Sequence, residues 1–538
     1  MLSRVSVFIS IILAIVINSL APTFFSRPAL GADRVKIYYG ILQRSIPIKS
    51  LELYAETGYI DDSLAAYTQY LNKEQLKQFR EALITPISLN VVAVSQFLYT
   101  PIGERLLGLL GDVIQLESRL TGFNAIRAAL IISAAQRESF TLLDVLRNYP
   151  SSAITINLTR TQEIAQTIQS FVSQTQNAIF TVNQTFQQEI NTTPISPTLR
   201  LRDWRQLGRF KGQRLTVTFN DLSRNRRFPT DIYLPVGASS PVIVISHGLG
   251  SDRTSFAYLA QHLVSHGFAV VVPEHPGSNA EQQQALLQGR ANTVTAPGEF
   301  IDRPLDIKYL LDQLTRLSQS NPTLKGRLNL QQVGVVGQSF GGYTALALAG
   351  ATINFEQLDK DCPALENSLN VSLLLQCLAA NLPRSEYNLS DPRVKAVIAI
   401  NSVSSSVFGQ ASLSQINVPT MIVASSNDTI APALPEQILP FTWLTTPNKY
   451  LALINGGTHF STIAESPDAT IPIPEQAIGA DPALARSYIK SLSVPFFQTY
   501  LTRQPSNISY LNPIYANIIS QEPLPLSLVQ NLTSTQLQ

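Results

Sequence analysis

Residues 333–350, VGVVGQSFGGYTALALAG, combine a β-branched run, a glycine-rich segment and an Ala- and Leu-rich run. The β-branched run 333–336 predicts a buried strand, and the Ala- and Leu-rich run that ends this stretch has the spacing of a helix. Between them, Gly-Gln-Ser-Phe-Gly predicts a sharp turn that exposes the Ser339 hydroxyl at the start of the helix. Gly337 and Gly341 fit this turn because a Cβ there would collide with the neighbouring strand or helix. Ser339 is therefore a candidate nucleophile, and a plain glycine-rich turn is the alternative.

The sequence around this turn alternates between strands and helices. Strands are expected at 214–219, 230–234, 242–246, 269–273, 333–336, 394–400, 420–424 and 450–454. From the third strand onward helical segments separate most of them, as at 253–265 and 302–317. Apolar strands alternating with helices indicate an α/β domain over 206–503, with a mostly parallel eight-stranded sheet flanked by helices. A closing helix is expected at 482–501, followed by an irregular C-terminal tail at 504–538.

The first part of the chain has a helical pattern with short loops. Residues 33–190 are predicted to form an all-α N-terminal domain, with a capping box at Asn72 and Gln75, one strand candidate at 153–158 and a long amphipathic helix toward the end. The stretch 191–205 is polar and contains two prolines, so it is predicted to be a linker.

The net charge, the first 32 residues and the cysteines bear on the partners and the location of the protein. The net charge is +2 and no Lys/Arg run is present, which argues against nucleic acid as a partner.

Residues 1–32 have the layout of a secretory signal peptide, so an exported protein is expected, with an uncleaved membrane anchor as the alternative. Cys362 and Cys377 are then expected to form a disulfide, and two buried thiols are the alternative. Both lie in a long insertion, 351–392, which is either a cap over the acyl pocket or a packed surface excursion.

A serine nucleophile needs a general base and a carboxylate that orients this base. His459, in NGGTHF after the last strand, is the candidate base, and Asp428, after the strand 420–424, is the candidate acid. The other histidines fit less well: His247 and His275 lie in turns, and His262 and His266 are expected on the surface. The alternative acids Asp391 and Glu386 lie in the insertion and are expected to be solvated.

The oxyanion of an acyl intermediate needs two N–H donors. The amide of Phe340 follows the nucleophile directly at the helix start, and the turn His247-Gly248-Leu249-Gly250 follows the third strand. We expect the amides of Phe340 and Leu249 to form the oxyanion hole. The chemistry requires no metal and no cofactor.

Two segments resemble known families. SHGLGSDRTSFAYLAQHLVSHG (246–267), FAVVVPEH and GQSFGG resemble the platelet-activating-factor acetylhydrolases and the related dienelactone-hydrolase-like proteins, over about 242–459. SQFLYTPIGERLL and FNAIRAALIISAA resemble a helical domain of unknown function that precedes α/β-hydrolases in exported bacterial proteins. The first resemblance implies an α/β-hydrolase with Ser339 as nucleophile, His459 as base and Leu249 and Phe340 as oxyanion donors.

The resemblance also has two departures. The acetylhydrolases place their acid after the sixth strand, where this chain has Asn401, and dienelactone hydrolases use cysteine where Ser339 stands. The expected activity is that of a serine esterase or lipase acting on carboxylic esters, with short-chain acyl esters of (phospho)lipids first among them. A peptidase, a polyester hydrolase and a catalytically idle envelope-binding module are the alternatives. Peripheral membrane contact and oligomeric state stay open.

Overall fold

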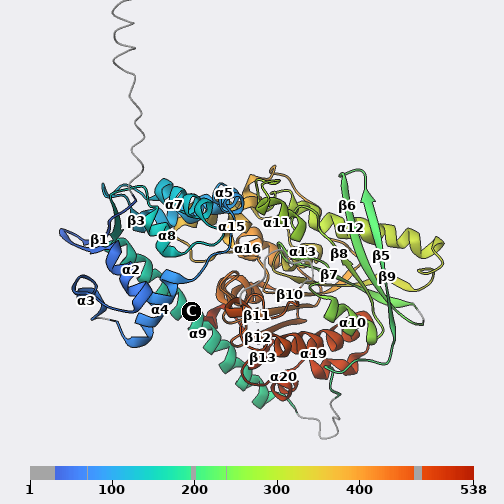
Figure 1. Ribbon diagram of the computed structural model, residues 1–538. Coiled ribbons are helices and arrows are strands. Elements are labelled where there is room, and N and C mark those ends of the chain that lie inside the picture. The colour runs from blue at the N-terminus through green and yellow to red at the C-terminus, as the bar shows by residue number, and fades with distance from the viewer. Residues whose placement is uncertain (1–30, 70, 195–201, 238, 466–474, 538) are drawn as a thin grey trace, which may run out of the picture. The chain divides into compact units, whose positions relative to one another are not determined.

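The computed structural model describes residues 31–69, 71–194, 202–237, 239–465 and 475–537 (Figure 1). Nearly all of the predicted signal segment 1–32 and the middle of the predicted linker lie outside these residues. The chain divides into two compact units, Met1–Leu98 with Leu106–Glu163, and Tyr99–Arg105 with Ile164–Gln538. None of the described helices has both the length and the apolar character needed to cross a membrane.

The first unit contains strands as well as helices, so the expectation of an all-α domain is wrong. Its described strands form one sheet in the order β2-β1-β4-β3, and β1 pairs in parallel with β4. The strands are β1 (Arg34–Tyr39), β2 (Leu42–Pro47), β3 (Ile114–Gln115) and β4 (Ala153–Asn157). The helices of this part of the chain are α2 (Ile48–Thr57), α3 (Asp62–Thr68), α4 (Lys73–Ile84), α5 (Val91–Leu98), α6 (Pro101–Val113), α7 (Phe123–Gln136) and α8 (Leu142–Arg147). The predicted capping box is present at the start of α4.

The helix α9 (Leu158–Thr192) contains the division between the units. From Ile164 onward it belongs to the second unit, where Val182 and Phe186 are buried in the hydrophobic core. Asn183 accepts a hydrogen bond from the Ser527 hydroxyl at 2.7 Å. The contacts therefore divide the chain earlier than the predicted boundary at 190. The prolines after residue 190 mark the end of α9. Its unit is determined instead by its apolar face, which packs in the core of the second unit.

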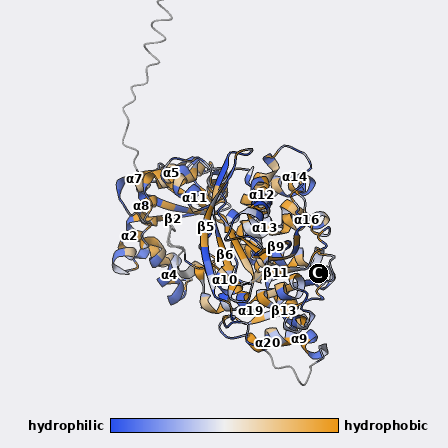
Figure 2. Cartoon of the chain, turned by 90° about the vertical axis from the view of Figure 1, so that its right-hand side faces the viewer, coloured by the Kyte–Doolittle hydropathy of each residue, from blue (hydrophilic) through white to orange (hydrophobic). Residues whose placement is uncertain are grey.

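In the described part of the second unit, nine strands form one sheet in the order β13-β12-β11-β10-β9-β7-β8-β6-β5. The strands are β5 (Gly212–Asp221), β6 (Arg226–Pro235), β7 (Ser240–Ser246), β8 (Ala269–Pro273), β9 (Leu328–Gln338), β10 (Val394–Ile400), β11 (Thr420–Ser425), β12 (Lys449–Ile454) and β13 (Leu526–Val529). Strands β7 to β12 pair in parallel, while β5, β6 and β13 join antiparallel. The edge strand β5 is mostly exposed and polar (Figure 2).

The eight expected strands are present, and β13 is a ninth. It lies in the segment 504–538, which was expected to be irregular but also contains helix α20 (Pro513–Ile519). Leu526 and Leu528 of β13 are buried, and Leu526 pairs with Ile454 of β12. A four-residue strand carries too little periodicity to be recognised without its partner.

Helices cover both faces of this sheet, as the continuous apolar strands require. Ile243 and Ile245 of β7 pack in one cluster with α10 (Ala257–Ser265) and α19 (Pro482–Leu501). Val242 and Val244, which point to the other face, pack with α12 (Glu299–Ser320) and α13 (Phe340–Leu348). The remaining helices are α11 (Ala280–Leu287), α14 (Phe355–Asp361), α15 (Leu373–Gln376), α16 (Ser405–Leu413), α17 (Leu439–Trp443) and α18 (Glu475–Ile478).

Candidate active site

Ser339 lies in the predicted turn between β9 and α13. Its backbone has φ +55° and ψ −117°, a conformation that residues with a side chain rarely adopt and that occurs preferentially at functional sites. A Cβ on Gly337 would lie 1.8 Å from the Gly341 carbonyl oxygen, and a Cβ on Gly341 would lie 2.0 Å from the Ser246 carbonyl oxygen. Both positions therefore exclude a side chain, for the steric reason expected from the sequence.

His459 and Asp428 lie against each other in loops that follow neighbouring strands. The His459 Nδ1 donates to Asp428 Oδ2 at 2.7 Å, and both side chains are buried. The other carboxylate oxygen accepts the N–H groups of Ile430 and Ala431 at 2.8 and 2.7 Å. Because an ionised carboxylate only accepts hydrogen bonds, the proton of neutral His459 is on Nδ1 and Nε2 is left as a proton acceptor.

All three residues follow parallel strands at the same edge of the sheet. Ser339 follows β9, Asp428 follows β11 and His459 follows β12, and the four strands from β9 to β12 are consecutive neighbours. The carboxyl ends of parallel strands are the usual place of active sites in such sheets. The chain order Ser, Asp, His therefore corresponds to three positions along one edge.

Two amide side chains hold the loop of His459, and neither role was expected. Gln338, the residue before Ser339, donates its Nε2–H to the His459 carbonyl at 3.1 Å. Asn401 donates its Nδ2–H to the carbonyls of Thr458 and His459 at 3.2 and 3.3 Å. Both side chains are buried. Gln338 stands inside the turn of Ser339, which is the one sequence signal for its role, whereas the sequence marks Asn401 only as the residue at the position of the acetylhydrolase acid.

The turn after β7 lies next to Ser339. A Cβ on Gly248 would lie 3.4 Å from the Ser339 Cβ. The Ser251 N–H donates to the Gly248 carbonyl at 3.3 Å, which closes the turn around Leu249. Within the described residues the Leu249 N–H donates no hydrogen bond, and the Phe340 N–H belongs to the first turn of α13, where no intrahelical acceptor exists. Both amides are thus available to an oxyanion.

Of the other candidates, His262, Asp391 and Glu386 form no hydrogen bond with His459 or Asp428 in the described structure, and two of them differ from expectation in their burial. His262 is buried, not on the surface, and burial together with the charge of His266 lowers its pKa to about 3. Asp391 is also buried, not solvated, and its carboxylate pairs with Arg393 at 2.6 Å. Glu386 is exposed, as expected. Among the described residues no group of His, Cys, Asp and Glu is arranged to hold a metal ion.

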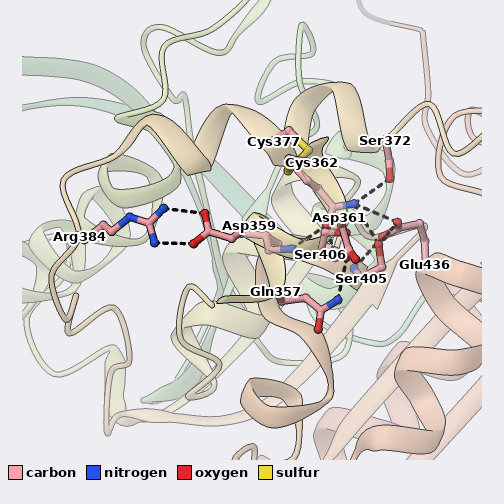
Figure 3. Close-up of a disulfide and its surroundings, with 12 residues drawn as sticks. Gln357, Asp359, Asp361, Cys362, Ser372, Cys377, Arg384, Ser405, Ser406 and Glu436 are labelled. Atoms are coloured by element: carbon pink, nitrogen blue, oxygen red, sulfur yellow. Dashed lines mark hydrogen bonds and ion pairs between the residues drawn. A yellow bond between two sulfur atoms is a disulfide. The ribbon is translucent and has the colours of Figure 1, made fainter. Parts of the chain in front are cut away.

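The insertion 351–392 carries an internal disulfide and is hydrogen-bonded to neighbouring segments (Figure 3). The expected disulfide between Cys362 and Cys377 is present and links the short helical segments of the insertion. Glu436, buried in the short helical segment Leu434–Ile438 that follows Asp428, accepts hydrogen bonds from the Gln376 side chain at 2.9 Å and from the Ser404 N–H at 2.7 Å. One carboxylate therefore joins the insertion to the segment that follows β10.

Two family models match the chain, in separate segments. Residues 31–157 match a family described as alpha/beta hydrolase of unknown function (DUF1400), and residues 241–354 match a model described as alpha/beta hydrolase fold. The second match runs from β7 through the nucleophile turn and α13, and so includes both Leu249 and Phe340.

Curated relatives are similar over part of their length. Platelet-activating factor acetylhydrolase from Cavia porcellus is 27% identical over 145 residues, which cover 21% of this chain and 32% of the relative. The same enzyme from Canis lupus familiaris is 28% identical over 148 residues, with 21% and 32% covered. Bis(hydroxyethyl) terephthalate hydrolase from Streptomyces coelicolor is 26% identical over 235 residues, with 43% and 54% covered.

The chain thus spans about a third of the length of the acetylhydrolases and about half of the terephthalate hydrolase. The sheet order, the nucleophile turn and the matched models agree with one another. The chain has the α/β-hydrolase fold, and in this domain it is similar to platelet-activating factor acetylhydrolases and to a bis(hydroxyethyl) terephthalate hydrolase.

Proposed function

We propose that this chain is a serine hydrolase that cleaves carboxylic esters. The observation that carries the proposal is the hydrogen bond from His459 Nδ1 to Asp428 at the sheet edge where Ser339 occupies a strained turn. A carboxylate that accepts this Nδ1–H keeps Nε2 free to take a proton and stabilises the imidazolium that results. If Ser339 had no role beside the His–Asp pair, nothing would require its strained backbone conformation.

The proposed reaction has two halves. In the first, Ser339 Oγ attacks the acyl carbon while His459 Nε2 takes the hydroxyl proton, and the N–H groups of Leu249 and Phe340 stabilise the oxyanion. Collapse of the tetrahedral intermediate breaks the bond to the alkoxy oxygen, which leaves as an alcohol with the proton from His459. In the second half, water replaces the alcohol, and the same proton transfers release the carboxylic acid and restore Ser339.

The similarity to acetylhydrolases supports short-chain acyl esters of lipids as the substrate class. The longer alignment with a bis(hydroxyethyl) terephthalate hydrolase supports a second candidate, hydroxyalkyl esters of aromatic acids. We further propose an exported protein, because a disulfide persists in oxidising compartments and is rare in reducing ones. The predicted signal segment, whose residues 1–30 are not described, fits this location.

The test combines a fluorophosphonate probe, which labels activated serines, with a panel of phospholipid and terephthalate esters of graded acyl size. The wild-type chain is expected to be labelled and to turn over one ester class, and Ser339→Ala is expected to lose both. Ser402→Ala is a matched control, because Ser402 is a buried serine near α13 whose hydroxyl has no hydrogen-bond partner in the described structure. A wild-type chain that is neither labelled nor active on any ester would contradict the proposed function.

A further inference from the structure

Arg303, on helix α12, is a fully buried cation that none of the proposed catalytic steps uses. Its guanidinium is surrounded by oxygen acceptors: it donates to the carbonyl of His247, to the hydroxyls of Ser246 and Ser278 at 3.3 and 3.0 Å, and to that of Thr344 at 3.3 Å. Burying a charge is costly unless its donors are satisfied. The cost here is met by acceptors that belong to two different parts of the active site.

These two parts are the segments that carry the proposed oxyanion donors. Ser246 and His247 lead into the turn of Leu249. On the other side, the Arg303 guanidinium lies over the ring of Phe340, 4.7 Å from its centroid. Thr344, which accepts the Nε–H of Arg303, donates to the Phe340 carbonyl at 2.9 Å. One side chain therefore connects the end of β7 to the start of α13.

Arg303, which binds the His247 carbonyl, is also connected to the Leu249 amide through the His247 side chain. The Nε2 of His247 accepts the N–H of His275 at 3.0 Å, so the ring proton is on Nδ1, which donates to the Gly248 carbonyl at 2.8 Å. This carbonyl and the Leu249 N–H belong to the same planar peptide and point in opposite directions. Burial and the nearby Arg303 cation lower the pKa of His247 to about 3, so the ring stays neutral in this arrangement.

Within the described residues Arg303 forms no ion pair, and Ser278 connects it to the nearby carboxylate of Glu299. Ser278 accepts from Arg303 and donates to Glu299 at 2.9 Å, while Glu299 and Asp306 each bind Arg226 at 2.7 Å. The Ser278 carbonyl accepts the N–H of Gly250 at 2.9 Å, which fixes the far side of the Leu249 turn. The carboxylates thus bind Arg226, and Arg303 donates to the end of β7 on one side and to Thr344 of α13 on the other.

We propose that Arg303 is a positioning residue that sets the distance between the Leu249 and Phe340 amides, and so shapes the oxyanion hole. The inference rests on the proposed function. Both amides act on the oxyanion, which exists in the transition state and not in the bound ester. Loss of Arg303 should therefore lower kcat and leave KM and the pH profile of kcat unchanged.

The test measures kcat, KM, the pH profile and the rate of fluorophosphonate labelling for Arg303→Met and Arg303→Lys. Arg303→Met is expected to lower kcat by about 10²- to 10³-fold, the usual effect of losing one oxyanion donor, with KM within about threefold of wild type. Arg303→Lys keeps the charge but cannot bind both sides at once, and a loss of about tenfold or more is expected.

Arg224→Met is the matched control. Arg224 pairs with Asp221, Asp302 and Asp306 in the same charged cluster, but in the described structure it forms no hydrogen bond with the turn of Leu249 or with the turn of Ser339. It should lose stability and keep kcat within about threefold. If Arg303→Met does not fold, Arg303→Lys decides, and a folded Lys variant with wild-type kcat overturns the inference. Equal losses of kcat in the Arg303 and Arg224 variants also overturn it, because they indicate a structural role. An inactive wild-type chain would instead contradict the proposed function.

Discussion

Replacing Asp428 by asparagine separates the orientation of His459 from the packing of its loop. Asp428 Oδ1 accepts two backbone N–H groups, at 2.8 and 2.7 Å, and the amide oxygen of asparagine can accept both. The NH₂ group would then replace Oδ2 and face His459 Nδ1, now 2.7 Å away. Two donors cannot share this contact, so the ring proton must move to Nε2.

The magnitude follows from this change of tautomer. With a proton on Nε2, His459 cannot accept the proton of Ser339, and triad aspartates changed to asparagine lose on the order of 10⁴ in kcat. This corresponds to about 5.4 kcal/mol of transition-state free energy at about 1.36 kcal/mol per factor of ten. Loss of one hydrogen bond to a charged group, about 1.5–3 kcal/mol, would account for roughly ten- to 150-fold at most.

The assay is kcat on a chromogenic short-chain ester, with circular dichroism to verify the fold. Asn401→Ala is the control, since Asn401 also holds the His459 loop but only through the carbonyls of Thr458 and His459. We expect a loss of less than about tenfold there, because a neutral hydrogen bond contributes about 1 kcal/mol. The reasoning is refuted if Asp428→Asn loses less than about 150-fold, or no more than Asn401→Ala.

Three further predictions concern stability and specificity. Ser339→Gly should abolish labelling yet raise the free energy of unfolding by about 1 kcal/mol, because glycine adopts the positive φ without strain; a destabilised variant in urea titration would contradict this. Replacing Cys362 and Cys377 by serine should lower the free energy of unfolding by about 3 kcal/mol, the value for a 15-residue loop. It should also change the preference between short and long acyl esters more than it changes probe labelling; an unchanged preference would make the insertion a structural element only. The folded-state pKa of His262 is about 3, below its unfolded value, so its contribution to stability is complete above pH 6.5. This contribution is lost as the pH falls from 6.5 toward 3, at up to about 1.4 kcal/mol per pH unit. His262→Phe should therefore make the melting temperature depend less on pH in this range, and an unchanged dependence would refute the assignment.

The sequence contains those features whose cause is local. The β-branched run before Ser339, the glycines beside it and the Ala-rich run after it obey backbone sterics and periodicity within a few residues, so strand, turn and helix were predictable. Ser339, Asp428 and His459 could be selected because each stands in the turn or loop that follows a predicted strand. The disulfide follows from two cysteines 15 residues apart in one insertion.

Contacts between distant segments had no such local signal. Which surfaces meet after folding determines three features: β1 pairs with β4, α9 packs in the core of the second unit, and β13 joins the sheet. The same holds for Arg303, which looks like any helical arginine in the sequence but is buried between β7 and α13. Propensity and periodicity act over a few residues, whereas the neighbours of a buried polar group are set by the topology of the whole sheet, and only the tertiary structure decides them.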